Sequence, residues 1–121
     1  MTQAPWSVVF AADAVEDLAL IEAHLMAAYQ AFGEQPVEAA QHAQARIEAI
    51  ITAAERLALA PLRGEAHDDL LPGLRHLTLN SAVYWFRLLP PVCDIQVREI
   101  QVLAVFFGGQ DHQRHMLVRL L

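Results

Sequence analysis

The sequence predicts an α+β fold in which a helical hairpin packs on a twisted antiparallel sheet. Helical periodicity dominates the first half of the chain, whereas period-2 and continuous apolar patterns dominate the second half. The linker between the two helical segments is short, which favours antiparallel helices. The expected order is β-α-α-β-β-β, with a short C-terminal helix as an option, and 121 residues suit one domain over residues 1–121.

The chain begins with an expected strand over residues 6–11, which is β-branched and aromatic. A helix follows, because Asp13 suits an N-cap, Glu16 completes a capping-box-like pair, and Gly33 is a natural stop. Its apolar residues recur at steps of three and four, as they would on one helix face: Leu18, Ile21, Leu25, Tyr29 and Phe32.

A second helix is expected from Pro36, which suits a first helical turn, to about Ala60, just before Pro61. Its polar residues alternate with an apolar stripe, as on a helix with one buried side. The expected stripe comprises Val37, Ala40, Ile47, Ile50, Ile51, Ala54 and Leu57.

Three strands are expected in the second half, over residues 74–79, 82–89 and roughly 95–107. An Asn-Ser pair separates the first two and a Pro-Pro pair the last two, so short connections imply antiparallel pairing. In the middle strand, Tyr84 and Phe86 point to one face and Trp85 to the other, so both faces should be covered. The helical hairpin should cover one face, and the C-terminal segment or a different chain the other.

The last strand shifts its alternation near Arg98-Glu99, which predicts a bulge or a bend. Beyond it, the C-terminal segment can form a short closing helix. Its inward residues would be Met116, Leu117 and Leu120.

The composition argues against a nucleic-acid binder, because the net charge is −6 and all eight basic residues are arginines. The acidic excess lies in residues 1–60, whereas residues 61–121 are neutral. The single cysteine, Cys93, excludes an internal disulfide and fits a reducing cytoplasm. We expect a cytoplasmic protein, since no signal peptide is visible and no apolar run is long enough for a membrane span.

No phosphate-binding glycine loop, Gly-x-Ser-x-Gly elbow or zinc-type cysteine pair is present, and no cofactor is expected. Asp111, His112 and His115 have a spacing that could hold a metal ion on a helix, but a solvated polar segment is favoured, so no metal is assigned. The acidic cluster with a histidine over residues 65–69 is interpreted as a solvated loop.

Arginines on the expected strands would form a local basic patch if they shared a sheet face. Arg75, Arg87 and Arg98 lie on these strands, with Arg63 and Arg114 at adjoining ends. Because strand register decides which face they occupy, exposed structural arginines are the alternative.

Four stretches, in this order and spacing, carry a resemblance that covers about residues 6–115: "VVFAADAVEDLALIEAHL", "RIEAIITAAERLALAPLRGE", "PGLRHLTLNSAVYWFRL" and "IQVLAVFFGGQDH". The sequence resembles the ParE/RelE superfamily of type II toxin–antitoxin toxins, and looks closest to the ParE (plasmid stabilisation) branch. The resemblance implies a helical hairpin on an antiparallel sheet and a cognate antitoxin that wraps the toxin. RelE-type members cut mRNA on the ribosome, whereas ParE-type members poison DNA gyrase without nuclease chemistry.

The departures from the RelE pattern favour the ParE branch. The chain has no lysine, and Ala104 and Phe107 stand where a basic residue and a histidine are often found. These side chains cannot bind charge that develops in a transition state, and a negative chain suits ribosome docking poorly. The resemblance therefore implies a protein-binding toxin rather than an enzyme.

The site residues that this interpretation assigns fall into two sets. The candidates for target contact are Arg75, Arg87, Arg98, Asp111, His112 and Arg114. The candidates for the antitoxin groove are Trp85, Phe106, Phe107 and Leu117. An isolated chain would expose that groove, so we expect that it can form a homodimer.

Two alternatives stay open. One is a RelE-like, ribosome-dependent mRNA endoribonuclease that uses Arg75, Arg87, Arg114 and His112. The other is a degenerate family member without toxicity.

Overall fold

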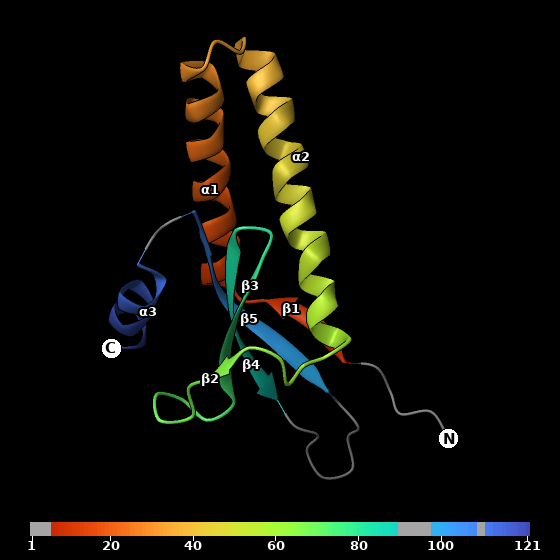
Figure 1. Ribbon diagram of the computed structural model, residues 1–121, viewed down its shortest axis with the longest axis vertical. Helices are drawn as coiled ribbons and strands as arrows, with labels where there is room; N and C mark the ends of the chain where they lie inside the picture. The colour runs from red at the N-terminus through yellow and green to blue at the C-terminus, as the bar shows by residue number, and fades with distance from the viewer. Residues whose placement is uncertain (1–5, 90–97, 109–110) are drawn as a thin grey trace.

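The structure is a computed structural model that describes residues 6–89, 98–108 and 111–121. Its order confirms the expected α+β fold and adds a short strand and a 3-10 helix (Figure 1). The elements are β1 (Ser7–Phe10), α1 (Ala12–Ala31), α2 (Pro36–Ala54), η1 (Glu55–Ala58), β2 (Glu65–Ala66), β3 (Leu74–Leu79), β4 (Ala82–Leu89), β5 (Glu99–Phe107) and α3 (His112–Leu120).

The sheet has the strand order β1-β5-β4-β3-β2 and is mixed rather than wholly antiparallel. Strands β2 to β5 pair antiparallel, but β1 pairs parallel with β5, from Ser7 opposite Glu99 to Phe10 opposite Val102. A parallel pair needs a long connection, and both long helices and three strands lie between β1 and β5 in the chain. The prediction of an all-antiparallel sheet was therefore wrong for this edge.

Helix α1 begins at Ala12, one residue before the predicted N-cap. Ala11 is the extended residue before the helix, and its N–H donates to the Val102 carbonyl oxygen at 2.8 Å, which continues the pairing of β1. Asp13 therefore lies in the first turn without capping it, and the capping-box prediction was wrong. Leu18, Ile21 and Leu25 are buried as expected.

The far ends of α1 and α2 extend beyond the sheet (Figure 1). Phe32 lies there and is 90% exposed, because no strand reaches it, so its predicted burial was wrong. Tyr29 is half-buried and its ring stacks on His42 at 3.7 Å between centroids.

Helix α2 ends at Ala54 and continues as the 3-10 helix η1, instead of staying α-helical to Ala60. The predicted stripe was wrong for Val37 and Ile51, which are 69% and 40% exposed. The buried residues of α2 recur at steps of four, four and three, and Val37 and Ile51 lie outside this face of the helix. Its members are Ala39, Ala43, Ile47 and Ile50, and the small alanines allow α1 close approach.

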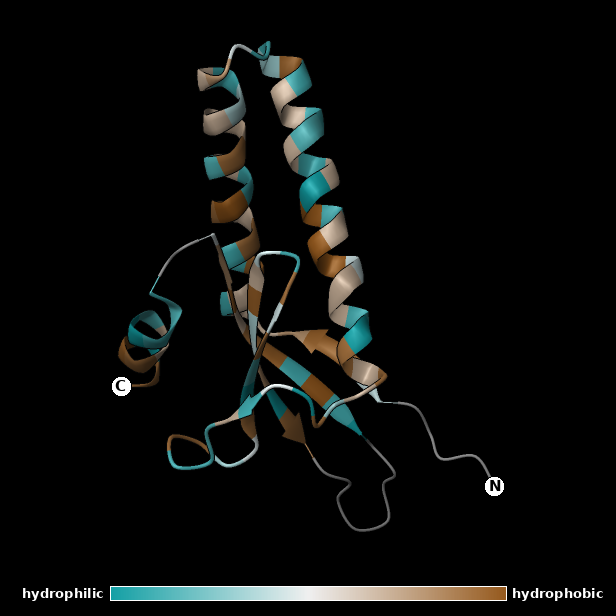
Figure 2. Ribbon diagram, in the orientation of Figure 1, coloured by the Kyte–Doolittle hydropathy of each residue, from teal (hydrophilic) through white to brown (hydrophobic). Residues whose placement is uncertain are grey.

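The sheet has an apolar cluster on each side. The helix face, covered by α1 and α2, includes the side chains of Ala82, Tyr84, Phe86, Ile100, Val102 and Val105. The outer face, covered by α3, includes Leu74, Val83, Trp85, Ala104 and Phe106, with Met116 from α3. Figure 2 shows the apolar residues along both the strands and the helices that cover them. The predicted separation of Tyr84 and Phe86 from Trp85 is confirmed.

A bulge in β5 lies at Leu103, not near Arg98-Glu99 as predicted. Trp85 pairs with Ala104 and the next residue, Phe86, pairs with Val102, so Leu103 has no partner across the ladder. The extra residue keeps Val102 and Val105 on the same helix face although they are an odd number of positions apart. The predicted strand residues 95–97, the Pro90-Pro91 pair and Cys93 lie outside the described residues.

The turn between β3 and β4 is the predicted Asn-Ser pair. Asn80 and Ser81 have φ values of 51° and 70°, as a two-residue hairpin turn of the right twist requires. The predicted C-terminal helix is present as α3, where Met116 is buried and Leu120 packs partly against the outer face. Leu117 is 44% exposed, so its predicted inward position was wrong. Across the described residues, no helix is long and apolar enough to cross a membrane.

Candidate functional site

Helix α3 covers the second face of the sheet. The sequence did not decide whether the C-terminal segment or a different chain would cover this face. Asp111 begins it, since its Oδ1 accepts the Arg114 N–H at 3.2 Å. Met116 is 1% exposed and packs in the cluster that contains Trp85 and Phe106. The outer face of the sheet is therefore closed at this position by the chain itself.

An ion pair ties α3 to α1 and to the bulge in β5. Asp17 is 7% exposed, and its two carboxylate oxygens each accept from the Arg119 guanidinium at 2.8 Å. Its Oδ2 also accepts the Val105 N–H at 3.0 Å, next to the residues where the bulge interrupts the ladder. The hydrogen bond to Asp17 raises the pKa of Arg119. A two-point pair of this geometry fixes the direction of α3.

Neither partner of this pair was among the site residues predicted from the sequence. The available signal was that Asp17 precedes Leu18 and lies four positions before Ile21, on the buried side of a helix. Arg119 offers a weaker signal of the same kind, because it lies three positions after Met116, the buried residue of α3.

A groove of about 690 Å³ lies between α1, the end of β5 and α3. Apolar and charged side chains line it together: Asp17, Leu20, Ile21, His24, Val105, Phe106, Phe107, His115 and Arg119. The guanidinium of Arg119 lies 5.4 Å from the ring centre of Phe106, and Arg46 lies at the same distance from Phe107. The lining of the groove is thus mixed: Arg119 lies near the Phe106 ring inside it, and Arg46, which is not part of the lining, lies near the Phe107 ring.

Two of the four antitoxin-groove candidates, Phe106 and Phe107, line this groove. Trp85 is 1% exposed beneath α3, and Leu117 is absent from the residues that line the groove. The candidates are therefore divided between one groove, the core of the outer face and the exposed side of α3.

Histidine rings gather on Trp85. The indole Nε1 of Trp85 donates to His112 Nδ1 at 3.2 Å, and the rings of His67 and His76 each lie 4.7 Å from the Trp85 ring. Burial lowers the pKa of His76, and the neighbouring His112 and His67 lower it further. His76 therefore favours its neutral form at neutral pH.

The expectation that residues 65–69 form a solvated loop was wrong in part. Glu65 and Ala66 form β2, which pairs with β3, and the His67 ring is partly buried against Trp85. The pairing turns His67 inward, whereas Asp68 and Asp69 are exposed as expected. No local sequence pattern predicts the inward position of His67, because it depends on a strand of only two residues.

Arg75 and Arg87 lie on opposite faces of the sheet, because Arg75 pairs with Phe86 and Leu74 pairs with Arg87. The guanidinium of Arg75 donates to the Leu62 carbonyl at 2.8 Å, and that of Arg87 to the Pro72 carbonyl at 3.0 Å. Each arginine thus holds a loop, and the two do not form a shared patch.

The remaining target-contact candidates are also dispersed. Arg98 lies just before β5, with its guanidinium 6.0 Å from the ring centre of Trp6. Arg114 is exposed on α3, and His112 on the same helix turns toward Trp85. The fold does not bring the set together as one site.

A helical hairpin on one side of a mixed five-stranded sheet, with a short C-terminal helix on the other, defines the class as a small α+β protein. The same fold occurs in a solved structure described as the chromosomal ParDE TA system from P. aeruginosa. The match has a TM-score of 0.59 and 21% sequence identity, and covers 86% of this chain and 97% of that chain. The match confirms the fold that the resemblance implied. No family model and no curated protein matches the sequence.

Proposed function

We propose that the chain is the toxin component of a type II toxin–antitoxin system, a cytoplasmic protein that a cognate antitoxin neutralises. The observation that carries the proposal is the fold shared with a chain of the ParDE system, over nearly the whole of that chain. The toxin domain spans residues 1–121, and the function is protein binding, with DNA gyrase as the target that the family resemblance implies.

The dispersal of the charged residues supports protein binding over nuclease chemistry. The endoribonuclease alternative needs Arg75, Arg87 and His112 around one phosphodiester, yet Arg75 lies on the helix face and the other two lie on the outer side. Arg75 and Arg87 also each donate a hydrogen bond to a loop carbonyl, which engages their guanidinium groups. A net charge of −6 further weakens attraction to RNA.

The groove between α1, β5 and α3 is the surface we assign to the antitoxin. Leu20 is 70% exposed at its edge, while Phe106 and Phe107 lie along it. An amphipathic antitoxin segment would bury these residues and present acidic groups to Arg46. Within the described residues, β1 and β2 are the edge strands of the sheet. A strand added by the antitoxin would pair with one of these edges.

Two assays run side by side test the target. Purified chain is added to a DNA gyrase supercoiling reaction and to a translation reaction in which mRNA cleavage is read. We expect inhibited supercoiling with intact mRNA. Cleaved mRNA with unaffected gyrase would overturn the proposal in favour of the endoribonuclease, and no effect in either assay would indicate the non-toxic alternative.

A substitution at the groove tests antitoxin binding. The product of a neighbouring small reading frame is titrated against the chain and against Leu20→Glu, which places a charge at the groove edge. We expect binding to weaken at least tenfold, a change of about 1.4 kcal/mol. Leu59→Glu is the matched control, since Leu59 is 85% exposed and does not line the groove. Equal loss in both variants would contradict the assignment.

A further inference from the structure

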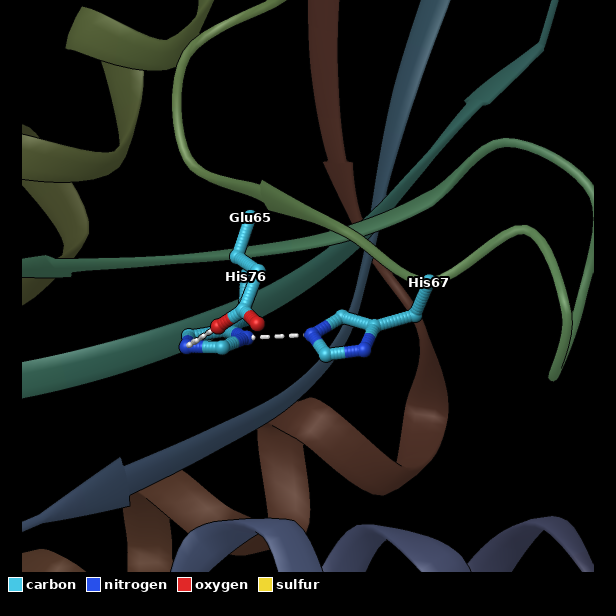
Figure 3. Close-up of side chains that lie close together, drawn as sticks. All are labelled: Glu65, His67 and His76. Carbon is cyan, nitrogen blue, oxygen red and sulfur yellow. Dashed lines mark hydrogen bonds and ion pairs between the residues drawn. The ribbon is translucent and has the colours of Figure 1, made fainter.

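We propose that Glu65, His67 and His76 form a binding site for a divalent transition-metal ion, with Zn²⁺ the best fit. Each side chain offers one ligand atom, and the three atoms all lie within 4.8 Å of one another (Figure 3). His67 Nε2 lies 2.7 Å from His76 Nδ1, the nitrogen of His76 that would bind the ion. Glu65 Oε2 lies 3.6 Å from the other ring nitrogen, His76 Nε2, so the carboxylate must move toward Nδ1 to join the site. No metal was predicted from the sequence, and the residues with a metal-type spacing, Asp111, His112 and His115, lie on the C-terminal segment.

The backbone places these three side chains on one face. Glu65 is the direct cross-strand partner of His76, and His67 follows Glu65 by two positions, so all three point the same way. The His67 N–H donates to the Leu74 carbonyl at 2.8 Å, which extends the pairing by one residue. The donor set is thus built on paired backbone rather than on a free loop.

Gly64 lets this pairing begin. Its φ is +89°, and a Cβ at this position would lie 2.3 Å from the His76 carbonyl oxygen. Only glycine therefore allows β2 to approach β3 where the site forms.

The donor chemistry suits zinc. Two imidazoles and one carboxylate are a ligand set of zinc sites that keep a fourth position open. With zinc–nitrogen bonds of about 2.0 Å, a tetrahedral site separates its ligand atoms by roughly 3.3 Å. The two nitrogens of the His67–His76 pair, now 2.7 Å apart, must therefore move slightly apart, and the proton between them must leave. The Glu65 side chain is 64% exposed, so it can swing toward the ion, and solvent can reach the open position.

His112 stays outside the ligand set although its ring lies 4.9 Å from that of His76. Its Nδ1 accepts from Trp85, so the neutral ring carries its proton on Nε2 and offers no further lone pair. Trp85 instead forms a wall against His67 and His76, which limits the positions that their rings can take.

The candidate set from the sequence does not converge in the structure. Asp111 caps α3 through the Arg114 N–H, and the His115 ring stacks near Phe106 at 5.9 Å between centroids. Both side chains are therefore engaged away from the site on β2 and β3.

The direct test is a calorimetric titration of the chelator-treated full chain with Zn²⁺ alone. We expect one ion per chain, and Co²⁺ substitution should give the visible absorption of a tetrahedral site. Glu65→Gln and His67→Gln should each weaken binding at least about tenfold. The exposed Glu65 leaves the fold intact when replaced, which circular dichroism checks.

His42→Gln is the matched control: His42 and Glu34 form another histidine–carboxylate pair at 3.0 Å, but among the described residues they belong to no cluster of three such donors. It should bind zinc like the unchanged chain. Wild-type affinity in Glu65→Gln, one ion per two chains, or loss of binding only in His112→Gln or His115→Gln would overturn the proposal. The titration needs neither antitoxin nor gyrase, so its failure leaves the proposed function untouched.

Discussion

The two faces of the sheet are built differently. On the helix face, α1 and α2 cover a cluster of aliphatic and aromatic side chains, with the hydroxyl of Tyr84 satisfied by the Ile50 carbonyl at 2.6 Å. On the outer face, one helix of nine residues covers a smaller cluster that is rimmed by histidines and held by the Asp17–Arg119 pair. The helix face therefore buries the larger apolar cluster, and the outer face carries the histidines that gather on Trp85.

The largest effect should come from the helix face. Phe86 is fully buried there, so Phe86→Ala should lower the free energy of unfolding by about 3–5 kcal/mol. Chemical denaturation measures the loss. A loss below about 1 kcal/mol would show that the two faces do not differ as described.

A smaller effect is expected on the outer face. Met116→Ala should cost about 2 kcal/mol, at the low end for a buried methionine, because α3 can detach while the helix face stays folded. Hydrogen exchange should show faster exchange confined to α3. Uniformly faster exchange across α1 and β4 would contradict this separation.

The ion pair that holds α3 is the next test. Arg119→Met leaves the Asp17 carboxylate buried with only the Val105 N–H as a described donor, so unfolding should become easier by about 1–3 kcal/mol. Adding Asp17→Asn should recover part of the loss, because a neutral side chain then occupies the buried position. A double-mutant cycle measures this coupling, and purely additive losses would refute it.

The smallest effect concerns Tyr84 and has a pH signature. Burial raises the pKa of Tyr84 to about 12, above the usual 10.0, so the folded state keeps its proton where the unfolded chain loses it. The contribution of Tyr84 to the free energy of unfolding is therefore constant below about pH 10 and should fall as the pH rises toward 12. Tyr84→Phe should cost about 1 kcal/mol at neutral pH. Denaturation across this range should then show a flatter decline than in the unchanged chain.

The elements were predictable where local patterns were strong. The strands over 74–79 and 82–89 and their Asn-Ser turn were found at the observed residues, because alternation and turn chemistry are both local. The buried stripe of α1 was found as far as Leu25. The stripe prediction failed at Phe32, where nothing reaches the helix tip.

The candidate site was far less predictable. His67, His76 and Glu65 meet only because a two-residue strand pairs with β3, and a pairing this short leaves no periodic signal. The faces of Arg75 and Arg87 depended on register, which the sequence analysis had left open. Asp17 and Arg119 lie 102 positions apart, so no local window contains both.

The sequence by itself determined the α+β class, the order of the long elements and the two-sided burial of β4, because these follow from short-range periodicity and turn residues. The tertiary structure alone decided the parallel edge at β1, the bulge at Leu103, the groove beside α3 and the histidine cluster on Trp85. Each of these depends on distant segments fitting together, and packing between distant segments is a property that no single stretch of sequence specifies.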